Sequence, residues 1–151
     1  MSKLLVIYQS LSGNTKKIAE AIALGAKTKY IKVTEIKEKD LLDAEIIFLG
    51  SGIYMGKHHR QIYGIIEKLT TKTKVYIFST AGMPILRFLW HSQLKKELAK
   101  KHIKIIGEKC FIGFDTFGPL KFFLGINQGR PNEQDIEQAR LVGEKLVTVT
   151  L

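Results

Sequence analysis

Apolar residues gather in short continuous runs along much of the chain. Such runs are typical of strands that are buried on both faces of a sheet. Three of them stand at Leu4–Tyr8, Ile46–Leu49 and Val75–Phe78. Tyr30–Val33 alternates apolar residues with lysine, which predicts an edge strand. Ile103–Ile106 and Cys110–Ile112 predict one longer or broken strand, so the pattern indicates five strands in all.

Between these runs, apolar residues recur at the three- and four-residue spacing of amphipathic helices. The helical segments are Asn14 to about Ala26, His58–Leu69, about Phe88–Lys101, and a last helix that opens at Pro131-Asn132-Glu133. Asn132 can cap this last helix, and the acidic Glu133 and Asp135 suit its positive end. A further short helix fits before Ile46. Strands that alternate with helices predict an α/β fold, a mostly parallel sheet covered on both faces, in one domain over residues 1–151.

Composition agrees with one globular domain, because 45% of the 151 residues are hydrophobic and 25% are charged. Cys110 is the only cysteine, which excludes a disulfide scaffold and fits a reducing, cytoplasmic setting. The first apolar run is too short for a signal peptide. No apolar stretch approaches the roughly 20 residues that cross a bilayer, so no transmembrane segment is expected.

The charge is strongly positive, since 24 Lys and Arg outweigh 14 Asp and Glu and give a formal net charge of +10. Such a balance favours acidic partners, nucleic acid or an anionic membrane. The lysines form no single run and no aromatic residues interleave with them, unlike a groove for single-stranded nucleic acid. We therefore interpret them as a solvated surface and expect no nucleic-acid partner.

The segment Ser10-Leu11-Ser12-Gly13-Asn14-Thr15 lies between the first predicted strand and the first predicted helix. Unpaired N–H groups and the positive dipole end make a helix N-terminus an anion site. The hydroxyls of Ser10, Ser12 and Thr15 can each donate one further hydrogen bond, and Gly13 allows close approach of the backbone. This design suits a terminal monophosphate. The alternative is a plain helix cap, but a cap needs one such residue rather than three.

Other phosphate-binding patterns fail at specific positions. A Walker A loop ends in Gly-Lys-Ser/Thr, whereas the segment Gly52–Lys57 is followed by His58. A dinucleotide fingerprint begins at Gly50 and Gly52, but Met55 replaces its third glycine. A response-regulator receiver domain needs carboxylates after the first and third strands, and this chain has none there.

The remaining candidate residues receive structural interpretations. His58 and His59 are adjacent and lack partners at metal-ligand spacing, so no metal site is predicted. His91 and His102 are interpreted as surface or helix-end residues, Cys110 as a small buried hydrophobe. Trp90 is likewise interpreted as a packing residue. No Ser/His/Asp set has supporting sequence context, and no catalytic residue is predicted.

The segment from Ser10 to Thr15 resembles the flavodoxin phosphate loop, T/S-x-T/S-G-x-T. The resemblance covers essentially the whole chain. It implies FMN as cofactor and a flavodoxin-like three-layer α/β/α sandwich, with a five-stranded parallel sheet in the order 2-1-3-4-5. Two later segments match by position the flavodoxin loops that hold the flavin ring. The implied cofactor-binding residues are Ser10, Leu11, Ser12, Gly13, Asn14, Thr15, Ser51, Gly52, Ile53, Tyr54, Met55, Gly56, Ser79, Thr80, Ala81 and Gly82.

The resemblance also implies individual roles. Tyr54, with Met55 as the alternative, would cover one face of the ring. The Met55-Gly56 peptide resembles the flavodoxin peptide that turns its carbonyl toward the flavin on reduction, and glycine makes such a turn cheap. Backbone groups of Ala81 and Gly82 would meet the polar edge of the ring. Flavodoxins are commonly acidic, whereas this chain is basic and carries Lys57 after the turning glycine, which would raise the flavin's potential.

Three functional hypotheses follow. The first is an FMN-binding electron-transfer protein, whose redox partners carry acidic docking surfaces. The second is a flavin-dependent oxidoreductase of protoporphyrinogen oxidase or quinone reductase type, acting on a small-molecule electron acceptor. The order Ser51, Tyr54, Gly56, His59 resembles that of menaquinone-dependent protoporphyrinogen oxidases. The segments 113–118 and 129–131 resemble those of an uncharacterised flavodoxin-like subgroup. The third is an anion or nucleic-acid binder without flavin, supported by the +10 charge alone.

Overall fold

The computed structural model describes residues 3–113 and 129–150. Its strands are β1 (Leu4–Gln9), β2 (Tyr30–Lys32), β3 (Ile46–Tyr54), β4 (Lys57–His58), β5 (Lys74–Ala81) and β6 (Lys104–Ile112). Its α-helices are α1 (Asn14–Ala26), α2 (Glu38–Asp43), α3 (Arg60–Lys68), α4 (Arg87–Trp90), α5 (Ser92–Lys100) and α6 (Glu133–Thr150). Two 3-10 turns, η1 (Val33–Glu35) and η2 (Pro84–Leu86), complete the described elements.

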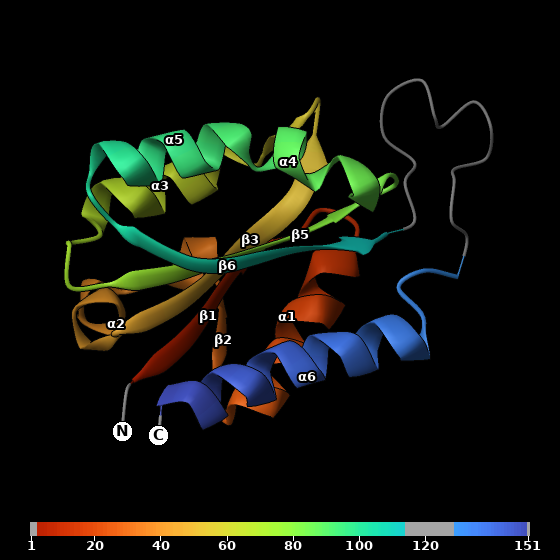
Figure 1. Ribbon diagram of the computed structural model, residues 1–151, viewed down its shortest axis with the longest axis horizontal. Helices are drawn as coiled ribbons and strands as arrows, with labels where there is room; N and C mark the ends of the chain where they lie inside the picture. Colours follow the sequence, from red (N-terminus) through yellow and green to blue (C-terminus); the bar gives the residue numbers. More distant parts are fainter. Residues whose placement is uncertain (1–2, 114–128, 151) are drawn as a thin grey trace.

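Five strands form a parallel sheet in the order β2-β1-β3-β5-β6 (Figure 1). The two-residue β4 pairs antiparallel with the end of β3 and lies outside this path. Counted without β4, the order is 2-1-3-4-5, which confirms the predicted flavodoxin-like architecture. Because all five strands are parallel, their carboxyl ends share one edge of the sheet.

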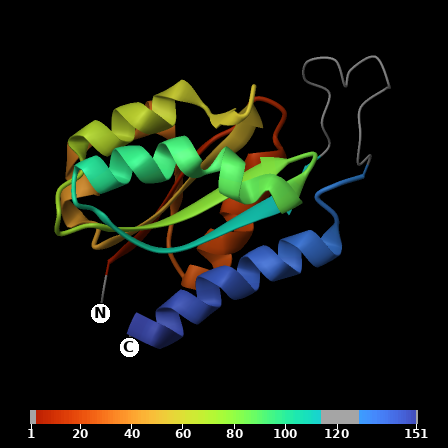
Figure 2. The same cartoon turned by 45° about the horizontal axis from the view of Figure 1, so that its top comes forward.

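Helices cover both faces of the sheet, as Figures 1 and 2 show. Helices α3 and α5 lie over one face, where Ile7, Leu49 and Ile77 belong to the buried core. Helices α1 and α6 lie over the other face, where Phe48 and Phe78 are fully buried. The continuous apolar runs are thereby explained, since successive strand residues face opposite layers and both layers exclude water.

The layer formed by α1 and α6 depends on two glycines at the helix crossing. A Cβ atom on Gly25 would lie 1.8 Å from the carbonyl oxygen of Arg140, and one on Gly143 would lie 2.1 Å from that of Ile22. Neither distance is possible for a real side chain, so the two backbones approach each other as closely as glycine alone permits.

Several predicted boundaries need correction. Strand β3 continues past Leu49 to Tyr54, and helix α3 begins at Arg60 rather than at His58, which belongs to β4. The helix expected over Phe88–Lys101 is divided at His91 into α4 and α5. The segment 113–118, singled out from the sequence, lies mostly outside the described residues, whereas 129–131 lies within them.

The predicted opening of the last helix is confirmed. The backbone N–H of Asp135 donates to Asn132 Oδ1 at 3.1 Å, and Asn132 N–H donates to Asp135 Oδ2 at 2.8 Å. This reciprocal pair satisfies two donors at the helix start. The Asp135 carboxylate also pairs with Arg130, and that pairing lowers the pKa of Asp135.

Candidate functional site

The Ser10–Thr15 segment forms a tight loop between β1 and the N-terminus of α1. Gly13 occupies the N-cap position with a φ of 90°, in the left-handed region that glycine adopts without strain. No side chain caps α1 there; the Ser10 hydroxyl instead accepts a hydrogen bond from Gly13 N–H at 2.9 Å. The plain-cap alternative is therefore wrong, because the loop hydroxyls do not serve as the helix cap.

A buried pair of hydroxyls ties this loop to the end of β5. Thr15 Oγ1 and Thr80 Oγ1 lie 2.8 Å apart, and both side chains are buried. Nearby, Gly113 N–H donates to the carbonyl of Ala81 at 3.0 Å. The Thr15–Thr80 contact brings the first residues of α1 against the end of β5.

The second predicted loop is a strand extension that ends in a hairpin. Ile53 pairs with His58 and Tyr54 with Lys57 around a two-residue turn. Both turn residues have positive φ, 51° at Met55 and 78° at Gly56, the pattern of a type I′ turn. The turn projects from the sheet edge, and the Met55 side chain is 82% exposed.

Tyr54 bridges this hairpin and the Ser10–Thr15 segment. Leu11 N–H donates to the Tyr54 hydroxyl at 3.3 Å, so residues 43 positions apart meet above the sheet edge. The Tyr54 side chain lies over Gly52, because a Cβ there would come within 2.7 Å of its hydroxyl oxygen. Its ring contacts His59 edge to face at 5.6 Å. Burial raises the pKa of Tyr54, which keeps the hydroxyl protonated.

Trp90 joins the hairpin to the segment after β5. Its indole N–H donates to the carbonyl of Met83 at 2.9 Å, and its ring would touch a Cβ on Gly56 at 3.4 Å. Trp90 does pack, but it packs beside the predicted flavin-ring loops rather than in the core. No sequence signal marks this, since its neighbour Gly56 is 34 residues earlier in the chain.

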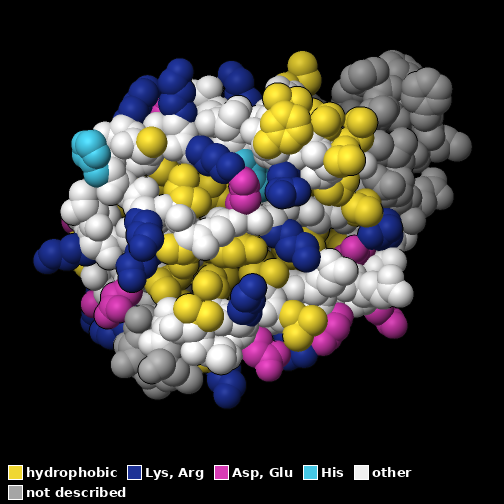
Figure 3. Space-filling view, viewed as in Figure 1, with side chains coloured by type: hydrophobic (Ala, Val, Ile, Leu, Met, Phe, Trp, Pro, Cys, Tyr) yellow, Lys and Arg dark blue, Asp and Glu magenta, His cyan; other side chains and the backbone are white. Residues whose placement is uncertain are grey.

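Exposed hydrophobic side chains gather near Trp90, and Figure 3 shows them over α4 and its neighbourhood. The described members of this apolar patch are Met55, Met83, Ile85, Phe88 and Leu89, each at least half exposed. Basic side chains at Lys57, Arg60 and Arg87 are exposed in the same part of the chain. Exposed apolar and basic side chains therefore occur together in these segments of the chain.

Beneath the same edge, polar side chains interrupt the core on the face that α3 and α5 cover. Four residues that are register partners across neighbouring strands β1, β3, β5 and β6 form this polar layer: Gln9, Ser51, Ser79 and Cys110. His58 Nδ1 lies 3.1 Å from Ser51 Oγ, and His91 Nε2 lies 2.6 Å from Ser79 Oγ. His91 does lie at a helix end, as the C-cap of α4 and the N-cap of α5, but its side chain is fully buried, so only the expectation of a surface residue is wrong.

Ser79 of the polar layer also belongs to a serine–histidine–acid set with His91 and Glu108, which the sequence did not reveal. His91 Nδ1 lies 2.7 Å from Glu108 Oε2, and Glu108 pairs in turn with Lys95. The members come from β5, the α4–α5 junction and β6, so their sequence spacing carries no pattern. Burial of Cys110, which the sequence predicted, raises the pKa of its thiol to about 11.

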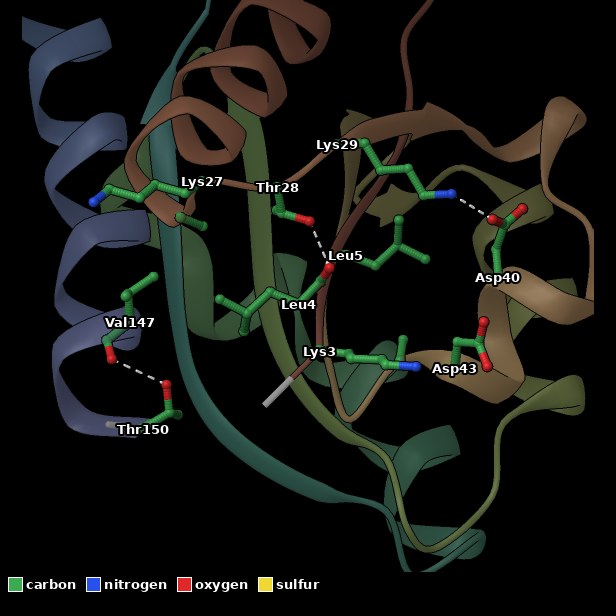
Figure 4. A pocket seen from close by; sticks show the side chains of 12 residues that line it. Lys3, Leu4, Leu5, Lys27, Thr28, Lys29, Asp40, Asp43, Val147 and Thr150 are labelled. Carbon is green, nitrogen blue, oxygen red and sulfur yellow. Dashed lines mark hydrogen bonds and ion pairs between the residues drawn. The ribbon is translucent and has the colours of Figure 1, made fainter. Parts of the chain in front are cut away.

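A cavity of about 600 Å³ lies near the opposite edge of the sheet, where β1 begins and α1 and α6 end (Figure 4). Lys29 pairs there with Asp40 at 2.6 Å, and Thr28 Oγ1 donates to the carbonyl of Leu4 at 2.6 Å. The ionic and hydroxyl groups that Figure 4 joins by dashed lines are thus already paired. None of the predicted cofactor-binding residues lines this cavity.

Comparison with known proteins agrees with this fold. Residues 5–113 match the family model of the flavodoxin domain. The chain belongs to the flavodoxin family. It is 39% identical over 140 residues to an uncharacterised protein of Methanocaldococcus jannaschii, covering 91% of this chain and 93% of that protein. It is 40% identical over 62 residues to a flavodoxin of Aquifex aeolicus, covering 37% and 34% of the two chains.

A solved flavodoxin from the domain Archaea superposes with a TM-score of 0.72 at 18% identity and covers 97% of each chain. Flavodoxins bind a flavin, usually FMN, and transfer electrons to partner proteins. None of the helices within residues 3–113 and 129–150 of this chain combines the length and apolar character that a membrane span requires.

The described residues fit such a cofactor in their chemistry. A helix N-terminus with a glycine at its N-cap and three hydroxyl residues around it offers neutral donors to a phosphate. The Tyr54 and Trp90 rings and the backbone at Ala81 stand at the same sheet edge. An apolar, flat ring system with one polar edge needs this combination of aromatic faces and backbone groups.

Proposed function

We propose that this flavodoxin binds FMN at the carboxyl edge of its sheet and carries electrons between partner proteins. The observation that carries the proposal is the convergence of three segments, Ser10–Thr15, Ser51–Gly56 and Ser79–Gly82, through the contacts of Tyr54 and Thr80. Bound FMN would supply the redox chemistry by accepting and donating electrons, so no side chain needs to act as acid or base on a substrate.

The phosphate would be held by residues 10–15 without a charged side chain. The α1 dipole and its unpaired N–H groups favour a dianion, and the hydroxyls of Ser10, Ser12 and Thr15 add donors. The ring would lie near Tyr54 on the hairpin and the backbone of Ala81 and Gly82. Of the twin candidates for covering a ring face, Tyr54 has the stronger support, because Met55 projects away at 82% exposure.

The partner of this chain would present an acidic surface with an apolar centre. The net charge is +10, and Lys57, Arg60 and Arg87 are exposed in the same segments of the chain as the apolar patch. Complementary charge accelerates association and depends on ionic strength. We expect electron transfer to an acidic one-electron carrier to slow at least tenfold in the double variant Lys57→Glu/Arg87→Glu, and Lys96→Glu on α5 to change it little.

The second hypothesis, oxidation of a porphyrinogen or reduction of a quinone, draws on the order Ser51, Tyr54, Gly56, His59 and on the apolar patch beside it. It uses the same flavin site. Turnover of either small molecule by the FMN-loaded protein would favour it over the carrier, whereas electron transfer only between proteins would favour the carrier.

Titration of FMN with the apoprotein tests the proposal, with riboflavin as the ligand that lacks the phosphate. We expect strong quenching of FMN fluorescence and weak quenching of riboflavin. Gly13→Asp and Gly13→Asn form a matched pair, because both side chains tolerate positive φ and the space around Gly13 is open to 4 Å. They differ only in charge next to the phosphate.

Gly13→Asp should therefore weaken FMN binding at least tenfold more than Gly13→Asn does, which corresponds to about 1.4 kcal/mol. Neither variant should change riboflavin binding. Equal FMN affinity of the two variants would contradict the placement of the phosphate at this loop, and absence of FMN binding to the native chain would overturn the proposed function.

A further inference from the structure

The polar layer beneath the proposed flavin site holds two buried histidines that electron carriage as described above does not use. The imidazole of His58 contacts Ser51 and that of His91 contacts Ser79, and Ser51 and Ser79 are register partners on β3 and β5. The two rings lie 5.1 Å apart between centroids. Their side chains are 3% and 0% exposed, respectively. A paired arrangement of two imidazoles in a core is costly unless each makes specific contacts.

Of the two, only His91 has a connection to an acid near solvent. Its Nδ1 lies 2.7 Å from the Glu108 carboxylate, whose side chain is 22% exposed. Lys95 pairs with the other oxygen of the same carboxylate. The line Ser79–His91–Glu108 therefore runs from the end of β5, where the flavin-ring segment begins, to the surface beside α5.

This set resembles a nucleophilic triad in order, but its position excludes that role. An acyl-transfer serine must meet a substrate, whereas Ser79 is fully buried in a central strand. What the arrangement offers instead is a titratable group with a fixed acceptor on one side and a hydroxyl on the other. A hydroxyl can donate to neutral imidazole and accept from imidazolium, so Ser79 serves both protonation states of His91.

The surroundings of His91 favour a neutral ring as long as no further negative charge is added nearby. Burial lowers the pKa of His91, Lys95 on α5 and Arg87 on α4 lower it further, and the Glu108 carboxylate opposes them. The other titratable neighbours are His58, whose pKa burial lowers to about 3, and the Cys110 thiol, whose pKa is raised to about 11. Both remain neutral near pH 7, which leaves His91 as the group of the layer that can change charge.

We propose that His91 takes up a proton when a flavin bound above the polar layer is reduced, and so compensates the added negative charge. This rests on the proposed function. The electrons come from the redox partner and stay on the flavin. One proton comes from the surrounding water and binds Nε2 of His91, while Nδ1–H continues to donate to Glu108. Ser79 changes from donor to acceptor, and its own hydroxyl proton can turn toward Cys110, its hydrogen-bond neighbour.

Nitrogen NMR of the histidine rings tests this directly. In the apoprotein we expect the neutral Nδ1–H tautomer of His91 near pH 7. In the FMN-loaded protein we expect its pKa to rise by at least one unit on reduction with dithionite, a tenfold gain in proton affinity. His91→Gln assigns the signals, and His102→Asn is the matched control, because His102 is exposed and has a positive φ that asparagine tolerates.

Glu108→Gln provides an independent check that leaves His91 in place. It should lower the His91 pKa in the apoprotein, because the carboxylate that stabilises imidazolium is removed. The midpoint potential of bound FMN should change less steeply with pH in His91→Gln than in the native protein. A tenfold difference in proton affinity between the oxidised and reduced protein corresponds to 59 mV for a one-electron couple.

The outcomes separate the two ideas. If FMN binds but the His91 pKa is the same in the oxidised and reduced protein, the inference is overturned and the proposed function stands. If FMN does not bind, both fail. If Glu108→Gln leaves the His91 pKa unchanged, the link between His91 and the carboxylate is wrong, and the inference fails with it.

Discussion

Acidification should destabilise this protein before its carboxylates begin to titrate, because His58 is a base buried in neutral form. Its side chain is 3% exposed, Nδ1 contacts Ser51, and the buried Nε2 has no hydrogen-bond partner among residues 3–113 and 129–150. Burial lowers the pKa of His58 from 6.5 to about 3, and the neighbouring His91 adds to this. Protonation therefore favours the unfolded chain throughout the interval between these two values.

The size of the effect follows from linkage. The unfolded chain binds a proton at His58 below about pH 6.5, whereas the folded protein does so only near pH 3. The contribution of neutral His58 to the free energy of unfolding is complete above about pH 6.5. It is lost as the pH falls toward 3, at about 1.4 kcal/mol per pH unit. Between pH 7.5 and 5 the free energy of unfolding should fall by about 2 kcal/mol through His58 alone.

Urea denaturation at half-unit steps from pH 5 to 8 measures this quantity. His58→Gln removes the titrating group, so its free energy of unfolding should fall about 2 kcal/mol less over the interval than that of the native chain. His102→Asn, at an exposed position, should keep the native slope. The reasoning is refuted if native and His58→Gln proteins lose stability in parallel, whatever the absolute stability of the variant.

Two further predictions concern stability elsewhere in the fold. Gly143→Ala should lower the free energy of unfolding by about 1–3 kcal/mol, since its Cβ would lie 2.1 Å from the Ile22 carbonyl oxygen. Gly64→Ala, with open space to 4 Å, should instead raise it by about 0.5–1 kcal/mol. Equal effects of the two variants in denaturant titration would contradict the close helix crossing. Lys101→Met removes an ammonium that donates to three carbonyls at the end of α3; it should cost about 1.5–3 kcal/mol, and the exposed Lys96→Met should cost much less.

The fold could be predicted from sequence where local signals and burial agree. Helix α1 has the bounds that its apolar spacing indicates, from Asn14 to Ala26. Helix α6 opens with the Asn132–Asp135 pair that cap chemistry favours. The strand order came from the resemblance to flavodoxins rather than from periodicity, because hydrophobic spacing carries no information about which strands are neighbours.

The end of β3 shows why boundaries fail. Gly50, Ser51 and Gly52 are residue types that favour turns, yet they continue the strand because β1 and β5 pair with Gly50 and Ser51 on both sides and β5 also pairs with Gly52. Gly50 is required by packing rather than by a turn, since a Cβ there would lie 2.4 Å from the carbonyl oxygen of Phe78. Tertiary pairing overrides the local preference, and the helix start shifts to Arg60 as a result.

The polar layer escaped prediction for a related reason and bears most directly on function. His58 and His91 are single histidines in separate segments, and Glu108 follows a lysine-rich stretch that suggests solvent. Only the parallel register of β3, β5 and β6 places their partners at one level of the sheet. That level lies directly under the segments proposed to hold the flavin. Aliphatic side chains at these two positions would stabilise the core more than imidazoles do. The two buried histidines are therefore better explained by a role in compensating charge at the proposed flavin site than by packing.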